Sequence, residues 1–276
     1  MAEIGVGARA EPGSGLLGRV SAETRIQVAT FLGIWAAWEA LARSGLFYRD
    51  IVPSSLKVMA ETWALLLDKE FYHHLGVTTY EVLAGFAIGS LAGIGLGILF
   101  GARRFLGRVM DGYILAIAPA PKVVFLPILM VMFGIGTGSK VAMAALSAFF
   151  PVVLSTVAGM HLINPTYIKV GRTFNASAWQ MVTKVYLPSL VLPVVTGLRL
   201  GLGVAIIGTL IAEIKLSKAG LGFLANYFYE RFWIPKMYAV ILIIFVLSIA
   251  ANALMTWLHD RMTRRGMPRV EVAGAA

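Results

Sequence analysis

The sequence predicts an all-α membrane protein with six transmembrane helices. Only 14% of its 276 residues are charged and 58% are hydrophobic, whereas soluble domains carry about 25% charged residues. The mean hydropathy is +0.79. Apolar runs recur along the chain at about the twenty-residue length that crosses a bilayer as a helix. These observations together exclude an ordinary soluble protein.

The first segments are a polar tail and a short apolar run. Residues 1–25 mix Gly and Ala with charges of both signs, and they lack the apolar core behind a basic stretch that marks a cleavable signal peptide. The first predicted span, 26–42, barely crosses a core of about 30 Å, but Trp35 and Trp38 favour a crossing. We therefore expect a tail over 1–25, a transmembrane domain over 26–260 and a second tail over 261–276.

A helix start at Pro53-Ser54-Ser55 comes before the remaining spans. Apolar residues at helical spacing after this start predict an amphipathic helix on the membrane surface. Three prolines, Pro119, Pro121 and Pro127, interrupt one of the later spans, and a proline removes a backbone donor and kinks a helix. Broken helices at membrane depth are found where the backbone is buried in protein or lines a cavity. The predicted spans are 76–101, 112–133 (the interrupted one), 140–163, 189–212 and 237–258.

Glycines recur every fourth residue in the second span, at Gly85, Gly89, Gly93, Gly97 and Gly101. This spacing places them on one face of the helix. In lipid, rows of small residues let two helices approach closely. We therefore expect this face to pack tightly against a neighbouring helix, in preference to a direct part in transport.

The distribution of cations predicts the orientation. Six spans place both termini on one side, and the side with more Lys and Arg is cytoplasmic. Thirteen Lys and Arg residues fall in the two tails, the basic loop 103–108 and the loop 165–188, against nine on the opposite side. Both termini and the loop 165–188 are therefore expected in the cytoplasm.

Several classes of site are excluded by the sequence. The chain has no cysteine, which removes disulfides and thiolate metal sites, and the adjacent His73 and His74 cannot share one helix face. Gly134 to Lys140 lacks two residues of a phosphate loop, because Ser139 replaces its last Gly and Val141 replaces its Ser/Thr. We therefore expect no metal, no cofactor, no nucleic acid partner and no catalytic residues in this chain.

Two cations, Lys122 and Arg199, fall near the middle of predicted spans. A cation at this depth costs several kcal/mol, of order 3, unless it faces a cavity, an acid or carbonyl groups. One interpretation is an anion path, in which the break at Pro119 and Pro121 exposes Lys122. The other is an internal tether to a carboxylate or to freed carbonyls. Glu39, Glu81 and Glu213 lie near span ends and are expected to be interfacial or pairing groups.

The loop 165–188 resembles the cytoplasmic signature of permease subunits of binding-protein-dependent ABC importers, which reads EAA, three residues, Gly, nine residues, Ile-x-Leu-Pro. Leu187-Pro188 aligns with the end of that signature, Asn175 with its Gly, and Lys169-Val170-Gly171 with EAA. The segments GRTFNASAWQ, YLPSLVLPVVTGLRLGLG, FLPILMVMFGIGTGSK and AGLGFL look like the nitrate/sulfonate/taurine branch.

The resemblance implies a non-catalytic, six-helix permease of the type I importer kind in a bacterial inner membrane. It implies a homodimer with two ABC ATPase subunits, a periplasmic or lipid-anchored solute-binding protein and a small anionic solute such as a sulfonate, taurine or nitrate.

Coupling helices in the loop would dock on the ATPase, with Phe174 and Trp179 as anchors and Arg172 as a polar contact. Asn tolerates the left-handed conformation of a bend, whereas Lys169 reverses the charge of the family's Glu. The implied coupling residues are Lys169, Val170, Gly171, Arg172, Thr173, Phe174, Asn175, Ala176, Ser177, Trp179, Leu187 and Pro188, and the implied translocation path contains Pro119, Pro121, Lys122 and Arg199.

Three alternatives remain open from the sequence. Members of the same branch carry neutral heterocycles such as thiamine precursors. A solute of this kind would leave the predicted architecture unchanged. An ion-coupled secondary transporter would suit the broken span, although no inverted repeat is visible. The glycine row would suffice for a non-transporting membrane scaffold, but such a scaffold would have little use for cations at mid-membrane.

Overall fold

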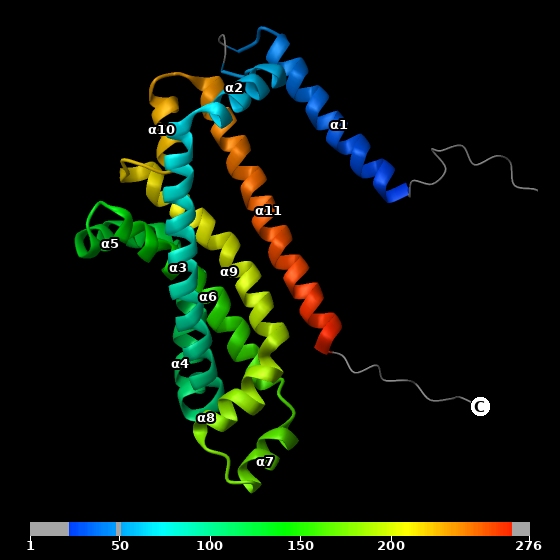
Figure 1. Ribbon diagram of the computed structural model, residues 1–276, viewed down its shortest axis with the longest axis vertical. Coiled ribbons are helices and arrows are strands. Elements are labelled where there is room, and N and C mark those ends of the chain that lie inside the picture. The colour runs from blue at the N-terminus through cyan, green and yellow to red at the C-terminus, as the bar shows by residue number, and fades with distance from the viewer. Residues whose placement is uncertain (1–21, 48–50, 267–276) are drawn as a thin grey trace, which may run out of the picture. The chain divides into compact units, whose positions relative to one another are not determined.

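The computed structural model describes residues 22–47 and 51–266, and these residues form helices and connecting loops with no β-strand (Figure 1). The chain divides into two compact units, residues 1–57 and 58–276. The helices are α1 Ala22–Arg43, α2 Ser55–Leu67, α3 Lys69–Ala102, α4 Arg104–Ile117, α5 Leu126–Phe133, α6 Thr137–His161, α7 Pro165–Thr173, α8 Ala178–Met181, α9 Leu187–Leu216, α10 Leu221–Glu230 and α11 Ile234–Gly266, with a 3-10 turn η2 at Lys122–Phe125 and a π-helical turn η3 at Val182–Tyr186.

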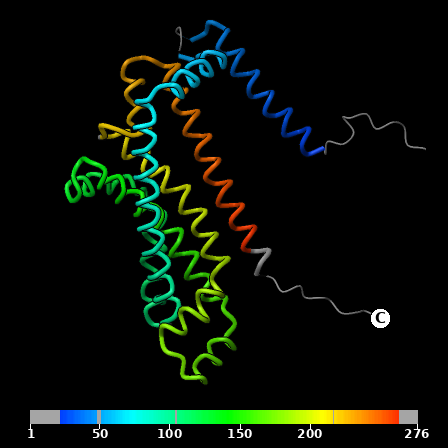
Figure 2. The backbone as a smooth tube through the Cα atoms, in the orientation of Figure 1, coloured from blue at the N-terminus to red at the C-terminus, as the bar shows by residue number. Residues whose placement is uncertain are grey.

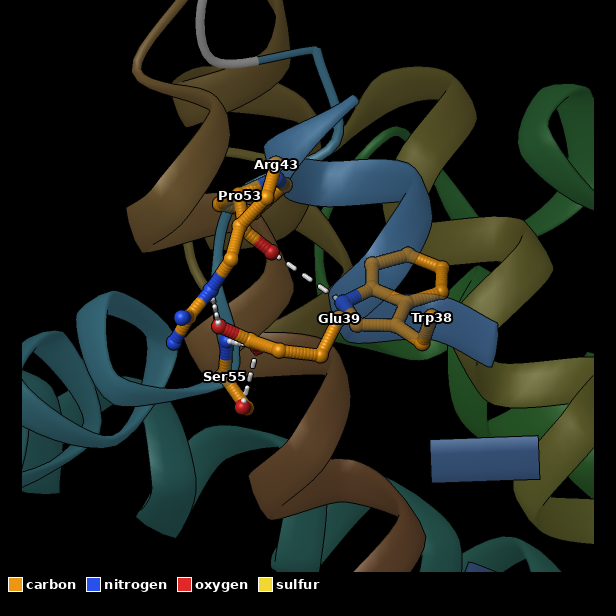
Figure 3. A network of polar contacts seen from close by, with 5 residues as sticks. All are labelled: Trp38, Glu39, Arg43, Pro53 and Ser55. Atoms are coloured by element: carbon orange, nitrogen blue, oxygen red, sulfur yellow. Dashed lines mark hydrogen bonds and ion pairs between the residues drawn. The ribbon is translucent and has the colours of Figure 1, made fainter. Parts of the chain in front are cut away.

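In the first unit, a polar network ties the end of α1 to the start of α2 (Figure 3). The Glu39 carboxylate accepts hydrogen bonds from the Ser55 hydroxyl at 2.7 Å, the Ser55 N–H at 3.1 Å and Arg43 Nε at 2.8 Å. The indole of Trp38 donates to the carbonyl of Pro53 at 3.1 Å. Glu39 thus satisfies an N–H at the start of α2 that has no partner within the helix. Glu39 is a pairing group, as the sequence predicts.

In the second unit, α6 lies between α3 and α9 and forms the core with them (Figures 1 and 2). All five glycines of the α3 row face α6. A Cβ atom on any of them would lie 3.0 Å or less from an atom of α6, and at Gly89 the obstacle is the backbone of Ala145. The prediction of a tightly packed helix face is therefore confirmed. Only glycine permits this distance between the two backbones.

A neighbouring face of α6 packs against a second set of small residues, from α9. Gly197 packs on Ser155, Gly201 on Val152 and Gly208 on Ser147. The helix α6 is therefore held closely on two sides along much of its length. The prolines within α6 and α9, Pro151 and Pro193, do not interrupt either helix.

The third span, 112–133, is interrupted at Pro119 and Pro121, as the sequence predicts. The helix α4 begins at Arg104, so most of the expected basic loop 103–108 is helical, and it ends before Pro119. The segments Phe105–Ile117 and Lys122–Phe133 then meet at an angle of 93°. The two prolines of the break, Pro119 and Pro121, remove two donors from the helix ladder, one on each side of Ala120. Pro127 lies in the first turn of α5, where its missing N–H breaks no bond.

Within the described residues, four helical segments are long and apolar enough to cross a membrane. They are α3, α6, the continuous run Ala178–Lys215 and α11, and the bent pair α4–α5 makes a fifth if it counts as one span. The first predicted span corresponds to α1, which carries Glu23, Arg25, Glu39 and Arg43 and is not among the four. The structure therefore confirms an all-helical membrane protein and gives four or five of the six predicted spans.

The three-helix core of α3, α6 and α9 has two distinct ends. One, called here the α7–α8 end, holds the C-terminus of α3, the C-terminus of α6 and the loop 165–188 (Figure 1). The other, called the α10 end, holds α10 and the start of α11. There Phe71, Leu221, Phe228 and Val240 form an apolar cluster.

Candidate functional site

The loop 165–188 folds as two short helices joined by a bend. Asn164 caps α7 by accepting the N–H of Thr166 at 2.9 Å, and Pro165 occupies the first turn. At the end of α7, Asn175 adopts a φ of 51°, in the left-handed region that Asn tolerates better than most residues. The bend thus lies at the position where the signature of the resembling family has Gly.

The second short helix, α8, starts with a capping box. The Ser177 N–H donates to Oε1 of Gln180 at 2.8 Å, and the Gln180 N–H donates to the Ser177 hydroxyl at 3.3 Å. A capping box satisfies two N–H groups that would otherwise lack partners and fixes the direction in which the helix starts. The direction of α8 relative to the bend is therefore set by local sequence.

The helices α7 and α8 approach each other closely at Gly171. A Cβ on Gly171 would lie 2.5 Å from the sulfur of Met181, and the carbonyl of Gly171 accepts the N–H of Ala176 at 2.9 Å across the bend. Beyond α8, the turn η3 leads directly into α9, with Pro188 in the first turn of α9. The bent element is thus rigid and joined to a core helix without an intervening loop.

One face of α7 and the surface of α8 are apolar and exposed. Tyr167, Val170 and Phe174 recur at helical spacing and are 58%, 48% and 82% exposed, and Trp179 on α8 is 74% exposed. A group of large apolar side chains in such a short segment marks an interaction surface. We call these four residues the aromatic face.

The twelve residues of the predicted coupling set are divided among the parts of this element. Lys169 and Arg172 are spaced three residues apart on the opposite side of α7 from the aromatic face, and both line a pocket on that side. Arg172 therefore lies on a different side of α7 from the aromatic face. The remaining members lie as follows: Val170, Gly171 and Thr173 on α7, Phe174, Asn175, Ala176 and Ser177 in the bend, Trp179 on α8, and Leu187 and Pro188 at the start of α9.

Lys122 lies at the break between α4 and η2. Its ammonium donates to the carbonyl of Ala118 at 2.7 Å and lies 5.2 Å from the centre of the Phe150 ring. In a continuous helix the Ala118 carbonyl would accept the backbone N–H of residue 122, whereas at the break it accepts the side-chain ammonium of that residue. These contacts agree with the second interpretation from the sequence, in which the ammonium of Lys122 is tethered to a freed carbonyl group within the chain.

Arg199 projects from an exposed part of α9, and its Nε donates to the amide oxygen of Asn252 on α11 at 3.2 Å. It lies about 18 Å along α9 from Leu187, at about 1.5 Å per residue. An arginine at this depth that faces lipid costs about 2.5–3.5 kcal/mol or more. Exposure in a single chain therefore indicates that this surface meets a second subunit or a water-filled path.

A buried charged cluster lies at the α10 end; the sequence predicts Glu81 and Glu213 as interfacial or pairing groups, but not that they meet Lys140 there. Glu81 on α3, Lys140 on α6 and Glu213 on α9 are each at most 1% exposed, and the three groups interact electrostatically with one another. The ammonium of Lys140 also donates to the carbonyls of Ile135 and Gly136. We call these three residues the buried charge cluster.

Glu213 connects this cluster to the loop before α10. Its carboxylate accepts the hydroxyl of Thr78 at 2.7 Å and the N–H of Gly222 at 2.6 Å. The Leu221 N–H donates to the Thr78 hydroxyl at 2.7 Å, and the Gly220 N–H donates to Nδ1 of His74 at 3.1 Å. The pattern that signals this site is the spacing of His74, Thr78 and Glu81, which continues the face of the glycine row. Within the described residues, no three His, Cys, Asp or Glu side chains are arranged to hold a metal ion.

The sequence is similar to those of a known protein family. Residues 89–264 match the family described as "Binding-protein-dependent transport system inner membrane component". The chain is 26% identical to a putative aliphatic sulfonates transport permease of Bacillus subtilis, over 84% of each chain. It is 29% identical to a formylaminopyrimidine transport permease of Halalkalibacterium halodurans (81% of this chain, 88% of that one) and 25% identical to a nitrate import permease of Synechococcus elongatus (70% and 71%).

A solved structure shares the fold. An inward-facing form of the MetNI methionine ABC transporter aligns with 74% of this chain and 97% of its own, with a TM-score of 0.56 and 19% sequence identity. At this level of identity the match supports the arrangement of the helices alone.

Proposed function

This chain belongs to the inner-membrane permease family of binding-protein-dependent ABC importers, in the nitrate/sulfonate/taurine branch, and we propose that it carries a small anion of the sulfonate, taurine or nitrate class into the cell. The movement is alternating access, driven by ATP hydrolysis on a separate subunit. The observation that carries this proposal is the bend of α7 and α8 with its aromatic face. An ATPase subunit must bind such an element before it can move the membrane helices.

The proposed coupling runs from the aromatic face into the core. Phe174 and Trp179 enter a cleft on the ATPase, where buried aromatic side chains supply much of the binding energy in protein interfaces. The capping box, Asn175 and Gly171 keep the bend from deforming under load. Because η3 continues into α9 at Leu187 and Pro188, a displacement of the bend is passed to α9 and, through its glycine contacts, to α6. Val170, Thr173 and Ala176 complete the docking element, while Lys169 and Arg172 lie beside it.

The proposed path for the solute includes the α4–η2 break, with Pro119, Pro121 and Lys122, and the exposed surface of α9 around Arg199. Lys122 holds the break in shape through its bond to the Ala118 carbonyl. Arg199 is exposed on the surface of the single chain, and its hydrogen bond to Asn252 fixes the direction of the guanidinium. A fixed guanidinium suits the planar oxygens of a sulfonate or a nitrate.

The proposed assembly is a homodimer with two ATPase subunits and a solute-binding protein outside the membrane. In this arrangement α1 and the bent pair α4–α5 complete six membrane passages, and the α7–α8 end and both termini face the cytoplasm. The excess of Lys and Arg on that side supports this orientation. Residues 1–21 and 267–276, which form most of the expected tails, lie outside the described residues.

A second candidate substrate is a neutral heterocycle, which the similarity to a formylaminopyrimidine permease favours. The two candidates differ in their dependence on Arg199. For an anion, Arg199→Met lowers uptake by at least about tenfold, since a hydrogen-bonded charge contact of roughly 1.5–3 kcal/mol is lost. For a neutral solute, uptake of that solute by the same variant is close to normal in proteoliposomes.

The coupling proposal is tested by purification of the permease with its ATPase. Phe174→Ala and Trp179→Ala each reduce the amount of ATPase retained, by about tenfold or more if these residues are interface hot spots. Phe232→Ala is the matched control, because Phe232 is also 82% exposed but lies between α10 and α11. Equal retention by all three variants would reject the aromatic face as the docking surface.

A further inference from the structure

The side of α7 opposite the aromatic face borders a large open pocket. Its volume is about 1000 Å³, and it is enclosed by the end of α3, the first half of α4, the end of α6 and α7. All of these elements belong to the second unit of the chain. The pocket is within the size range of sites for small organic ligands, about 300–1,000 Å³.

The charges of this pocket are mostly positive. Arg108 comes from α4, Lys169 and Arg172 come from α7, and His161 ends α6; Asp111 is the one acid among the lining residues. Lys169 and Arg172 are exposed in the described structure. Two guanidinium groups and an ammonium around one cavity are the groups that proteins use to bind phosphate oxygens.

The same pocket has an apolar wall. Phe100 and Ile168 are half-buried, and Met160 and Ile163 are buried. This wall lies where α3 and α6, two of the membrane-crossing helices, come to an end. A soluble phosphate ion would be held by the cations alone and would have no use for the apolar wall, whereas a phospholipid presents a charged headgroup and an apolar body side by side.

We propose that this pocket binds the headgroup and glycerol region of an anionic phospholipid from the adjacent leaflet. Arg108, Lys169 and Arg172 contact the phosphate, and Phe100 and Ile163 contact the apolar part. Basic pockets between transmembrane helices are known to hold anionic headgroups in this way. The proposal goes beyond the transport function and requires only that α3 and α6 cross a membrane.

A bound lipid of this kind gives α7 two different partners. Its aromatic face is free for a protein, while its cationic face is held against α4 by the shared phosphate. This arrangement also supplies a reason for the positive charge of Lys169 where the resembling family has an acid, because a glutamate there would repel the headgroup. Occupancy of the pocket would then stiffen α7 at its junction with the core.

The experiment measures lipid binding to the full-length protein by native mass spectrometry, with phosphatidylglycerol, phosphatidylcholine and inorganic phosphate as probes. The wild type is expected to retain phosphatidylglycerol about tenfold better than phosphatidylcholine. The double variant Lys169→Gln/Arg172→Gln is expected to lose most of this preference, about tenfold. The matched control, Lys184→Gln/Lys215→Gln, removes the same charge from exposed positions outside the pocket and is expected to keep it.

Three results would overturn the proposal. They are equal retention of the two lipids by the wild type, an equal loss in the control variant, and displacement of phosphatidylglycerol by inorganic phosphate at the same concentration, which would assign the pocket to a soluble anion. If the double variant does not fold, Arg108→Gln on α4 gives the same test from the other wall. Because lipid retention is measured and transport is not, failure here leaves the proposed function untouched.

Discussion

At the α10 end of the three-helix core, Glu81, Lys140 and Glu213 are each at most 1% exposed, whereas at the α7–α8 end Lys169 and Arg172 line an open pocket. In the first group, Glu213 accepts from Thr78 and from the Gly222 N–H, and Lys140 donates to the carbonyls of Ile135 and Gly136. The second group presents its charges outward, next to exposed aromatic side chains. One end is therefore closed by internal bonds, whereas the other presents charged and aromatic side chains to its surroundings.

The largest effect is expected from breaking the buried charge cluster. Glu213→Gln leaves Lys140 with one fewer carboxylate, and removing one partner of a buried ion pair costs about 3–5 kcal/mol. Thermal unfolding of the purified protein should show a clear loss of stability. Glu70→Gln, at an exposed position in the first turn of α3, is the control and should unfold like the wild type. Similar curves for both variants would mean that the two ends do not differ in the way described.

The next effect is expected where α3 meets α6 between the two ends. In Gly89→Ala, the added methyl group meets the backbone of Ala145, which cannot move aside as a side chain can, and overpacking of this kind costs about 1–3 kcal/mol. Gly95→Ala, on the same helix, places its methyl group in open space with no atom within 4 Å. Stability of the two variants should therefore differ, with Gly95→Ala equal to or better than the wild type. A reversed order would contradict the packing of the glycine row.

The smallest effect on stability, and the most specific effect on function, is expected at the bend. Asn175→Val places a β-branched residue at a φ of 51°, which costs about 1–2 kcal/mol and is confined to the α7–α8 end. Transport should fall while ATP hydrolysis by the complex continues. Asn175→Gly, which adopts this conformation freely, should transport normally. Full coupling in the valine variant would remove the bend from the mechanism.

The long core helices and the close packing of α3 could be predicted from the sequence because each depends on local pattern. Apolar length gives α3, α6, α9 and α11, and the four-residue spacing of Gly85 to Gly101 gives a packed face whichever helix lies opposite. The position of Asn175 in a bend follows from the spacing of the loop signature and the tolerance of Asn for positive φ.

The sharp turn at Pro119 and Pro121 and the buried charge cluster could not be predicted. Prolines indicate a break, but the angle of 93° depends on how α5 packs after it. Glu81, Lys140 and Glu213 are separated by dozens of residues, so their meeting depends on the tertiary arrangement of three helices. Likewise, Lys169 and Phe174 are close in sequence, and their separation onto two faces appears only when α7 is seen as a helix with a pocket on one side.

The two sets of glycines that hold α6 between α3 and α9 also bear on how the protein can change shape. Helices in contact through their backbones have few side chains between them that could switch rotamer, so they have few ways to slide or roll against each other. Deformation should therefore concentrate outside this trio, at the α4–η2 break and in α11. Spin labels placed on α3 and α9 should keep a constant separation through the ATP cycle, while a label on α5 should move relative to both.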